Sequence, residues 1–319
     1  MVLRLRHLHA VRVLMGNEMQ VNVVFGADKI FVEHLAVAIC SLFECNPNLS
    51  FSVYVLNSDI DKESWSKLAE LAEKYGQSLA DVKILDHDVE GLIRSGNYYT
   101  KATYYRLFIP EKLNVDKALY LDSDIVVNGS IEDLYNTNID QYYLAAVADW
   151  TQDPHKDLEM SEHARYFNCG VMLVNLRKWR EDRVKERVID LTRNKPWAMR
   201  CADQCGINSI VNGRGMELPP KYNAQAIFFQ IRFEHIRSEL YSVGQLREAV
   251  ENPVIIHYSG KDKPWHLGYK HRFRGLYWKY LRQTPFASNS RAERPFTNVM
   301  VLCARKLNRE VKKRILRRP

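Results

Sequence analysis

The chain has 319 residues, 46% apolar and 26% charged, a composition typical of a globular protein with one large α/β domain or two small ones. Its formal charge of +8 comes entirely from residues 291–319, which hold ten Lys or Arg and two Asp or Glu. The remainder is neutral, which argues against a nucleic-acid-binding surface, and no apolar run approaches the ~20 residues of a membrane-spanning helix.

From residue 19 onwards, short apolar runs alternate with segments of helical periodicity. The apolar runs predict strands at residues 20–27, 51–56, 81–85 and 118–121. The periodic segments predict helices at residues 31–44, 62–75 and 103–108. Pro110 should end the last of these helices. The alternation indicates an α/β fold with a doubly wound parallel sheet, in which ligands bind beyond the carboxyl ends of the strands.

Beyond residue 140, three more strands and three more helices are expected. The strands are predicted at residues 142–149, 167–175 and 254–257, and the helices at residues 176–194, 202–210 and 273–281. The first 18 residues lack the continuous apolar core of a signal peptide. We therefore expect an N-terminal extension (1–18), one α/β domain (19–284) and a basic C-terminal tail (285–319).

Two acidic residues directly follow the strand predicted at residues 118–121, in the sequence Asp122-Ser123-Asp124. At a strand end the chain can turn so that both carboxylates converge on one divalent cation. Such a cation prefers oxygen ligands and can also bind the phosphate oxygens of a leaving diphosphate. An Asp-x-Asp sequence alone is more often a solvated loop, but the apolar runs on both sides favour a site.

A histidine ends the last predicted strand and begins the sequence HYSGKDKPW. A neutral imidazole at this place can be a third metal ligand, although a single histidine often has only a structural role. Gly260 would let the loop approach a ligand closely, and Lys263 would reach a diphosphate.

A third candidate is the adjacent pair Asp203 and Gln204. An acid and an amide side by side can contact sugar hydroxyls or stabilise an oxocarbenium-like centre. The alternative for Asp203 is a helix N-cap. Arg106 is either a buried ion-pair partner or a contact to phosphate or sugar.

The six cysteines include no Cys-x-x-Cys pair. Cys201 and Cys205 are four residues apart, which places them on one face if this segment is helical. A zinc site would require two further ligands nearby, and none stand out. Reduced, mostly buried thiols of a cytosolic protein are therefore expected.

The tail contains apolar residues at every fourth position, with basic residues between them. The apolar positions are Val299, Cys303, Leu307, Val311 and Ile315. This pattern predicts a basic amphipathic helix that binds anionic membranes. The alternative is a helix packed on the protein itself or on a partner.

Six segments, in order, resemble glycosyltransferase family 8, the retaining sugar-nucleotide transferases that include bacterial lipopolysaccharide galactosyl- and glucosyltransferases and glycogenin. They are FGAD (25–28), KATYYRLFIP (101–110), LYLDSDIVV (119–127), FNCGVMLVNLRKW (167–179), ADQ (202–204) and HYSGKDKPW (257–265). The resemblance implies a single GT-A type, Rossmann-like nucleotide-binding catalytic domain. Family members often have an acid or a small residue at the position of Cys205 and Ala at the position of Cys169.

The resemblance also implies three groups of site residues. The metal ligands would be Asp122, Asp124 and His257, holding Mn²⁺ or Mg²⁺. The donor-binding residues would be Gly26, Ala27, Asp28, Arg106, Asp122, Ser123, Asn168, Gly260 and Lys263. The catalytic residues would be Asp203, which also positions the donor hexose, and Gln204, beneath the anomeric carbon.

The expected function is the retaining transfer of galactose or glucose from a UDP-sugar to a lipid-linked oligosaccharide such as lipopolysaccharide core. The expected location is the cytoplasmic face of a bacterial plasma membrane, with no nucleic-acid partner. A nucleotidyltransferase is the alternative enzyme, but FGADKIF contains one Gly and no Gly-rich phosphate loop. The non-enzymatic alternative is a sugar-nucleotide or glycan-binding module without turnover, and a broken Asp-x-Asp pair or a missing His257 would favour it.

Overall fold

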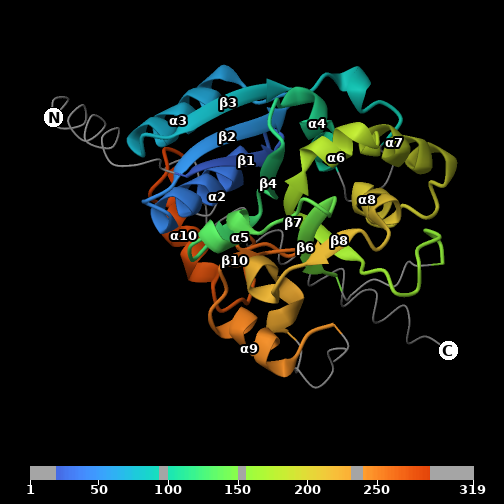
Figure 1. Cartoon of the computed structure of the whole chain (residues 1–319). Coiled ribbons are helices and arrows are strands. Elements are labelled where there is room, and N and C mark those ends of the chain that lie inside the picture. Colours follow the sequence, from blue (N-terminus) through green and yellow to red (C-terminus); the bar gives the residue numbers. More distant parts are fainter. Residues whose placement is uncertain (1–18, 93–99, 150–155, 231–239, 288–319) are drawn as a thin grey trace, which may run out of the picture.

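The computed structural model describes residues 19–92, 100–149, 156–230 and 240–287 (Figure 1). A seven-stranded sheet has the order β3-β2-β1-β4-β7-β6-β8. Its strands are β1 (Gln20–Gly26), β2 (Ser50–Asn57), β3 (Ser78–Lys83), β4 (Lys117–Leu121), β6 (Leu144–Ala148), β7 (Phe167–Asn175) and β8 (Gly215–Glu217). The α/β fold class and the strand–helix alternation of the first half are confirmed.

The sheet is mixed and not wholly parallel, which corrects the prediction. Strands β1 to β4 run parallel, but β7 is antiparallel to both β4 and β6. All nine residues of β7 are buried, and Val171–Val174 form a continuous apolar run within it. Such a run indicates burial on both faces and carries no information on strand direction.

Alternate side chains of the central strands enter two cores on opposite faces of the sheet. Val23 and Phe25 of β1 belong to the first core, and Val24 belongs to the second. On the first face, α2 (Val32–Cys45) contacts α3 (Lys62–Lys74) and α10 (Arg274–Leu281), as Figure 1 shows.

The second face carries the helices of the middle of the chain. They are the 3₁₀ helix Lys101–Phe108, α4 (Ile109–Lys112), α6 (Leu176–Glu181), α7 (Val184–Asn194) and α8 (Asp203–Val211). Helices α7 and α8 pack against each other, and α8 contacts β7. The helix predicted to stop at Pro110 instead continues into α4, because a proline is tolerated in the first turn of a helix.

The helix predicted at residues 176–194 is two helices. Arg183, between α6 and α7, has φ of 50°, which is a left-handed conformation. The segment contains no glycine or proline, so its sequence does not indicate this break. Helix α9 (Val243–Glu251) was not predicted. It begins with a capping box in which Ser242 and Gln245 exchange hydrogen bonds, and this Ser-x-x-Gln signal is visible in the sequence.

A three-stranded sheet joins the large sheet just beyond β4. It consists of β5 (Ile125–Val127), β10 (Ile255–His257) and β9 (Ala224–Gln225), with β10 in the middle. The turn Asp122–Asp124 therefore links the two sheets, and the antiparallel pairing of His257 with Ile125 places the end of β10 beside it. In the part of the chain that the structure describes, no helix combines the length and apolarity that crossing a bilayer requires. The predicted extension 1–18 and the tail segment 288–319 lie outside the described residues.

Candidate active site

A cavity of about 860 Å³ lies at the carboxyl ends of β1, β4 and β6. Every residue predicted for the site lines this cavity: Gly26, Ala27, Asp28, Arg106, Asp122, Ser123, Asp124, Asn168, Asp203, Gln204, His257, Gly260 and Lys263. These residues come from segments that are more than 200 positions apart. The structure thus gathers the predicted residues in one place, and their individual roles remain predictions.

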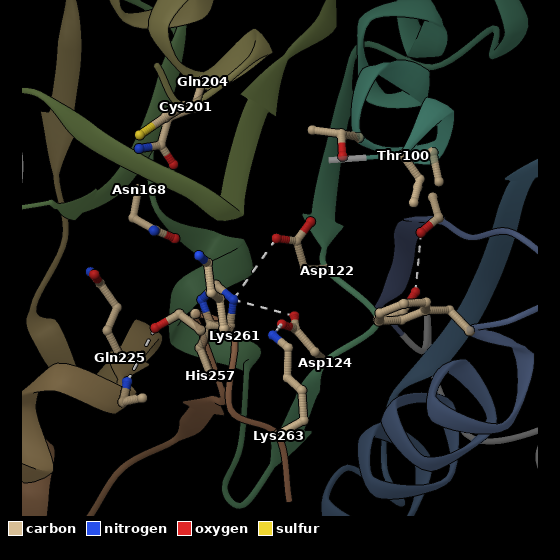
Figure 2. Close-up of a pocket in the computed structure, with 18 of the residues that line it drawn as sticks. Thr100, Asp122, Asp124, Asn168, Cys201, Gln204, Gln225, His257, Lys261 and Lys263 are labelled. Atoms are coloured by element: carbon tan, nitrogen blue, oxygen red, sulfur yellow. Dashed lines mark hydrogen bonds and ion pairs between the residues drawn. The ribbon is translucent and has the colours of Figure 1, made fainter. Parts of the chain in front are cut away.

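Three side chains form a cluster that fits a divalent cation. Ligand atoms of Asp122, Asp124 and His257 all lie within 4.8 Å of one another. His257 Nε2 is 3.3 Å from Asp124 Oδ1 and 3.9 Å from Asp122 Oδ2, and both contacts are drawn in Figure 2. Two carboxylates and an imidazole are ligands that Mn²⁺ accepts readily, and Mg²⁺ favours the carboxylates.

The orientation of the imidazole supports this assignment. His257 Nδ1 lies 2.9 Å from the amide oxygen of Asn223 and donates to it. Nε2 thereby faces the two carboxylates, where its lone pair would ligate a bound cation, as in metal sites where a second partner orients the imidazole. Asn223 is fully buried and donates to the amide oxygen of Asn168, which also accepts from the Gly170 N–H. Asn168 therefore supports the cluster through its oxygen, and its NH₂ group is the part available to a ligand.

Gly170, on β7, leaves the space that this cluster occupies, and no role was predicted for it. A Cβ atom at this position would lie 2.3 Å from His257 Cε1 and 2.8 Å from Asp122 Oδ2. The Asp122 N–H donates to the Gly170 carbonyl at 2.7 Å, which holds the two backbones in close contact. The sign in the sequence is a glycine inside a predicted buried strand, a pattern that indicates close approach of another group.

Lys263 contacts the Asp124 carboxylate and donates to the Tyr258 carbonyl at 2.8 Å. Burial by itself would raise the pKa of Asp124, but the Lys263 ammonium and His257 outweigh burial and hold that pKa well below its usual range. The sequence predicted that Lys263 points to a diphosphate. In this structure its ammonium lies on the Asp124 carboxylate.

Arg106 and Asp203 form a buried charged pair beside Asp122. Arg106 Nε is 2.8 Å from Asp203 Oδ2, and its NH1 is 3.4 Å from Asp122 Oδ1. The Nε–H is directed at the Thr103 carbonyl, so the contact to Asp203 is electrostatic and not a hydrogen bond. Among the described residues, neither Asp203 oxygen has a hydrogen-bond partner, although Asp203 is fully buried. Two unsatisfied acceptors on a cavity wall are suited to hydroxyl groups of a bound ligand.

The buried Asp203 should make stability depend on pH. Burial raises its pKa to about 7, against the effect of Arg106 and with that of Asp122. The unfolded chain loses this proton at a lower pH than the folded protein does. The contribution of Asp203 to the free energy of unfolding therefore falls as pH rises from about 4 to 7, and it is constant above that range. Urea unfolding measures how much the free energy of unfolding decreases between pH 5 and pH 8. We expect this decrease to be smaller in Asp203→Asn than in the unmodified protein, by a few kcal/mol at most. Equal losses in the two proteins would contradict this assignment.

Three contacts fix the amide of Gln204. Its oxygen accepts from the Cys169 N–H at 3.0 Å, and its nitrogen donates to Asp149 at 3.1 Å and to the Tyr166 hydroxyl at 3.3 Å. Asp149 is buried, lines the cavity and follows β6. No role was predicted for Asp149, although it ends a predicted strand, where ligand-binding residues are found.

At the other end of the cavity, the residues after β1 form a tight turn. Asp28 Oδ1 accepts the N–H groups of Ile30 and Phe31 at 3.0 and 3.1 Å. Ser123 donates to the Gly26 carbonyl at 3.1 Å, which joins this turn to the acidic turn. A Cβ on Gly26 would lie 3.2 Å from the Ala102 carbonyl oxygen, so the backbone is closely enclosed.

Comparisons with known proteins identify the family. The chain is 29% identical over 274 residues to general stress protein A of Bacillus subtilis, covering 82% of this chain and 93% of that protein. It is 32% identical to a lipopolysaccharide 1,2-glucosyltransferase of Escherichia coli, covering 77% and 73%. It is 31% identical to the glycosyltransferase GlyB of Streptococcus pneumoniae, covering 81% of this chain but 61% of that longer protein.

The fold matches that of the galactosyltransferase LgtC, solved with donor and acceptor sugar analogs, with a TM-score of 0.75 at 23% identity over 83% of this chain and 96% of that one. This likeness confirms the predicted GT-A type fold. A sequence profile of Glycosyl transferase family 8 matches residues 22–267. The match includes strands of both sheets and every residue predicted for the site, and the chain therefore belongs to glycosyltransferase family 8.

Proposed function

We propose that this protein is a retaining hexosyltransferase that moves galactose or glucose from a UDP-sugar to a hydroxyl of a lipid-linked oligosaccharide such as lipopolysaccharide core. One observation carries the proposal. The acidic cluster of Asp122, Asp124 and His257 opens into the same cavity as the buried Asp203 and the fixed amide of Gln204. A cation-binding end and a hydroxyl-binding end in one cavity suit a sugar diphosphate.

In this proposal, Asp122, Asp124 and His257 hold Mn²⁺ or Mg²⁺, which would neutralise charge on the leaving diphosphate. Gly26, Ala27 and Asp28 surround the uridine. Asp203 accepts hydroxyl hydrogens of the donor hexose, assisted by Arg106 and Asn168. Gln204 supports the positive charge that develops at the anomeric carbon.

The direct test is release of UDP from a panel of UDP-sugars with Mn²⁺ present. UDP-galactose or UDP-glucose should be hydrolysed slowly to release UDP, and UDP should be released faster when a glycan acceptor takes up the hexose. Failure of every donor would overturn the proposal in favour of a binding module, and release of pyrophosphate from a nucleoside triphosphate and a sugar phosphate would favour a nucleotidyltransferase.

The contact between Lys263 and Asp124 predicts competition between this lysine and the cation. Binding of Mn²⁺ at Asp124 weakens a charge-assisted hydrogen bond, which is typically worth about 1.5–3 kcal/mol. We expect Lys263→Met to bind Mn²⁺ roughly tenfold more tightly without a donor, measured by calorimetry, and to bind the UDP-sugar more weakly. Lys261→Met is the matched control, because Lys261 lines the cavity and is exposed. Equal Mn²⁺ affinity in the two variants would refute the competition.

Two further observations support the proposed acceptor and location. The similarity to a lipopolysaccharide 1,2-glucosyltransferase favours a lipid-linked acceptor. The basic pattern of residues 291–319 favours attachment to the cytoplasmic face of a bacterial plasma membrane.

Deletion of residues 291–319 should therefore weaken binding to vesicles that contain anionic lipid, since each basic residue near such a surface contributes about 1 kcal/mol. UDP release should be unchanged in the truncated protein. Sedimentation with anionic and with neutral vesicles measures the effect, and equal sedimentation of the full and truncated chains with anionic vesicles would exclude a membrane role for the tail.

A further inference from the structure

Two cysteines lie where the cavity wall meets α8, and neither takes part in the proposed chemistry. Cys201 is half-buried in the turn before α8 and lines the cavity, and Figure 2 shows it close to Gln204. Cys205 is buried in the first turn of the helix. Its sulfur accepts from the backbone N–H of Cys201 at 3.3 Å and from the Cys201 side chain. The two thiols are therefore in contact, and one of them is accessible from the cavity.

The surroundings of Cys205 stabilise a thiolate. The hydrogen bond from the Cys201 side chain lowers the pKa of Cys205 to about 7 despite burial, with a contribution from the Tyr166 hydroxyl at 3.2 Å. In contrast, burial raises the pKa of Cys40 and of Cys169. Of these three buried cysteines, Cys205 has the thiol that is most readily ionised near neutral pH, and the thiolate is the nucleophilic form.

We propose that Cys201 and Cys205 form a peroxide-sensitive dithiol, and that closing it to a disulfide slows the transferase. A peroxide entering the cavity oxidises Cys201: its sulfur attacks one oxygen, the O–O bond breaks, and the thiol proton leaves with the other oxygen as water. The Cys205 thiolate then attacks the sulfur of the resulting sulfenic acid. The S–S bond forms, the S–O bond breaks, and the departing hydroxide takes up the proton lost from Cys205 as a second water.

The disulfide would disturb the proposed catalytic residues because they lie between the two cysteines. A disulfide would hold the Cβ atoms of Cys201, in the turn before α8, and Cys205, in the first turn of α8, about 3.5–4.5 Å apart, and so would constrain the backbone of Asp203 and Gln204 between them. The turn is already strained, since Ala202 has φ of 52° and ψ of −133°. The Tyr166 hydroxyl, which contacts both the Cys205 sulfur and the Gln204 amide, would lose its sulfur acceptor.

The effect on activity rests on the proposed function, but the chemistry of the dithiol does not. The full-length protein is treated with hydrogen peroxide, remaining thiols are blocked, and disulfide-linked peptides are mapped by mass spectrometry. UDP release is measured before treatment, after treatment and after reduction with dithiothreitol. The same series is run on Cys201→Ser and Cys205→Ser, and on Cys40→Ser as a control that leaves the dithiol intact.

We expect a Cys201–Cys205 linkage and a loss of UDP release on the order of tenfold, which the reductant restores. The two dithiol variants should each keep their own starting rate, and Cys40→Ser should behave as the unmodified protein does. Absence of the linkage refutes the dithiol, and a linkage without loss of activity refutes its effect on transfer. Equal inactivation of Cys201→Ser would assign the damage to another residue. An inactive reduced protein that still forms the linkage would count against the proposed transferase activity alone.

Discussion

Asp124→Asn should lower UDP release by more than about a hundredfold and abolish tight Mn²⁺ binding. Asp124 contributes one of the three ligands of the cluster and lies 3.3 Å from the imidazole. Loss of a residue that only orients a metal ligand typically costs 10–100-fold, so the loss of a ligand should cost more. The measurements are steady-state UDP release and Mn²⁺ affinity by calorimetry.

Asp124→Asn should also destabilise the folded protein, and this effect must be measured separately from the effect on catalysis. Lys263 is 5% exposed, and without the Asp124 charge its buried ammonium would keep the Tyr258 carbonyl as its one other hydrogen-bond partner among the described residues. A charge left without its partner inside a protein typically destabilises it by 3–5 kcal/mol. The double variant Asp124→Asn with Lys263→Met removes both charges and should recover much of this stability, but not Mn²⁺ binding.

Asp116→Asn provides the control for removing an acid near β4, because Asp116 is 76% exposed and pairs with Arg180 at the surface. It should retain activity. If the double variant regained Mn²⁺ binding together with stability, the cluster would not be the metal site.

The first half of the fold followed from the sequence because its local patterns agree with its tertiary structure. Strands β1, β2 and β4 are short apolar runs, and α2 and α3 show the expected helical periodicity. The antiparallel direction of β7 did not follow, since its partners β4 and β6 are reached through loops whose course no local pattern fixes. Strand β9 has two residues, too few to show any periodicity.

Site residues that directly follow predicted strands could be predicted from the sequence. Contacts between residues that are far apart in the chain could not. Asp122, Asp124 and His257 follow or end apolar runs, and their position at one edge of a sheet made a cluster plausible. The support of His257 by Asn223 joins residues 34 positions apart and depends on the pairing of β9 with β10. Likewise, nothing local shows that Lys263 and Asp124, which are 139 positions apart, are in contact.

Gly170→Ala should reduce Mn²⁺ affinity and UDP release by about a hundredfold without removing any ligand. The new methyl group would lie 2.3 Å from His257 Cε1 and 2.8 Å from Asp122 Oδ2, closer than non-bonded atoms approach. The backbone of Gly170 is held by its 2.7 Å hydrogen bond from Asp122 and by the buried strand β7, so the imidazole and the carboxylate must move instead. A displacement of about 1 Å in a reactive site can cost a hundredfold in rate.

The stability of this variant separates a local effect from misfolding. Overpacking a buried position typically costs 1–3 kcal/mol, which the protein should tolerate with its secondary structure intact. Gly275→Ala, in α10, is the matched control: its Cβ would meet no atom within 4 Å, and a helical Gly→Ala change should be neutral or stabilising in thermal unfolding. A folded Gly170→Ala protein with normal Mn²⁺ affinity would show that His257 and Asp122 need not converge. A folded Gly170→Ala protein that binds Mn²⁺ weakly would show that the metal site requires glycine at position 170 as much as it requires the three ligands.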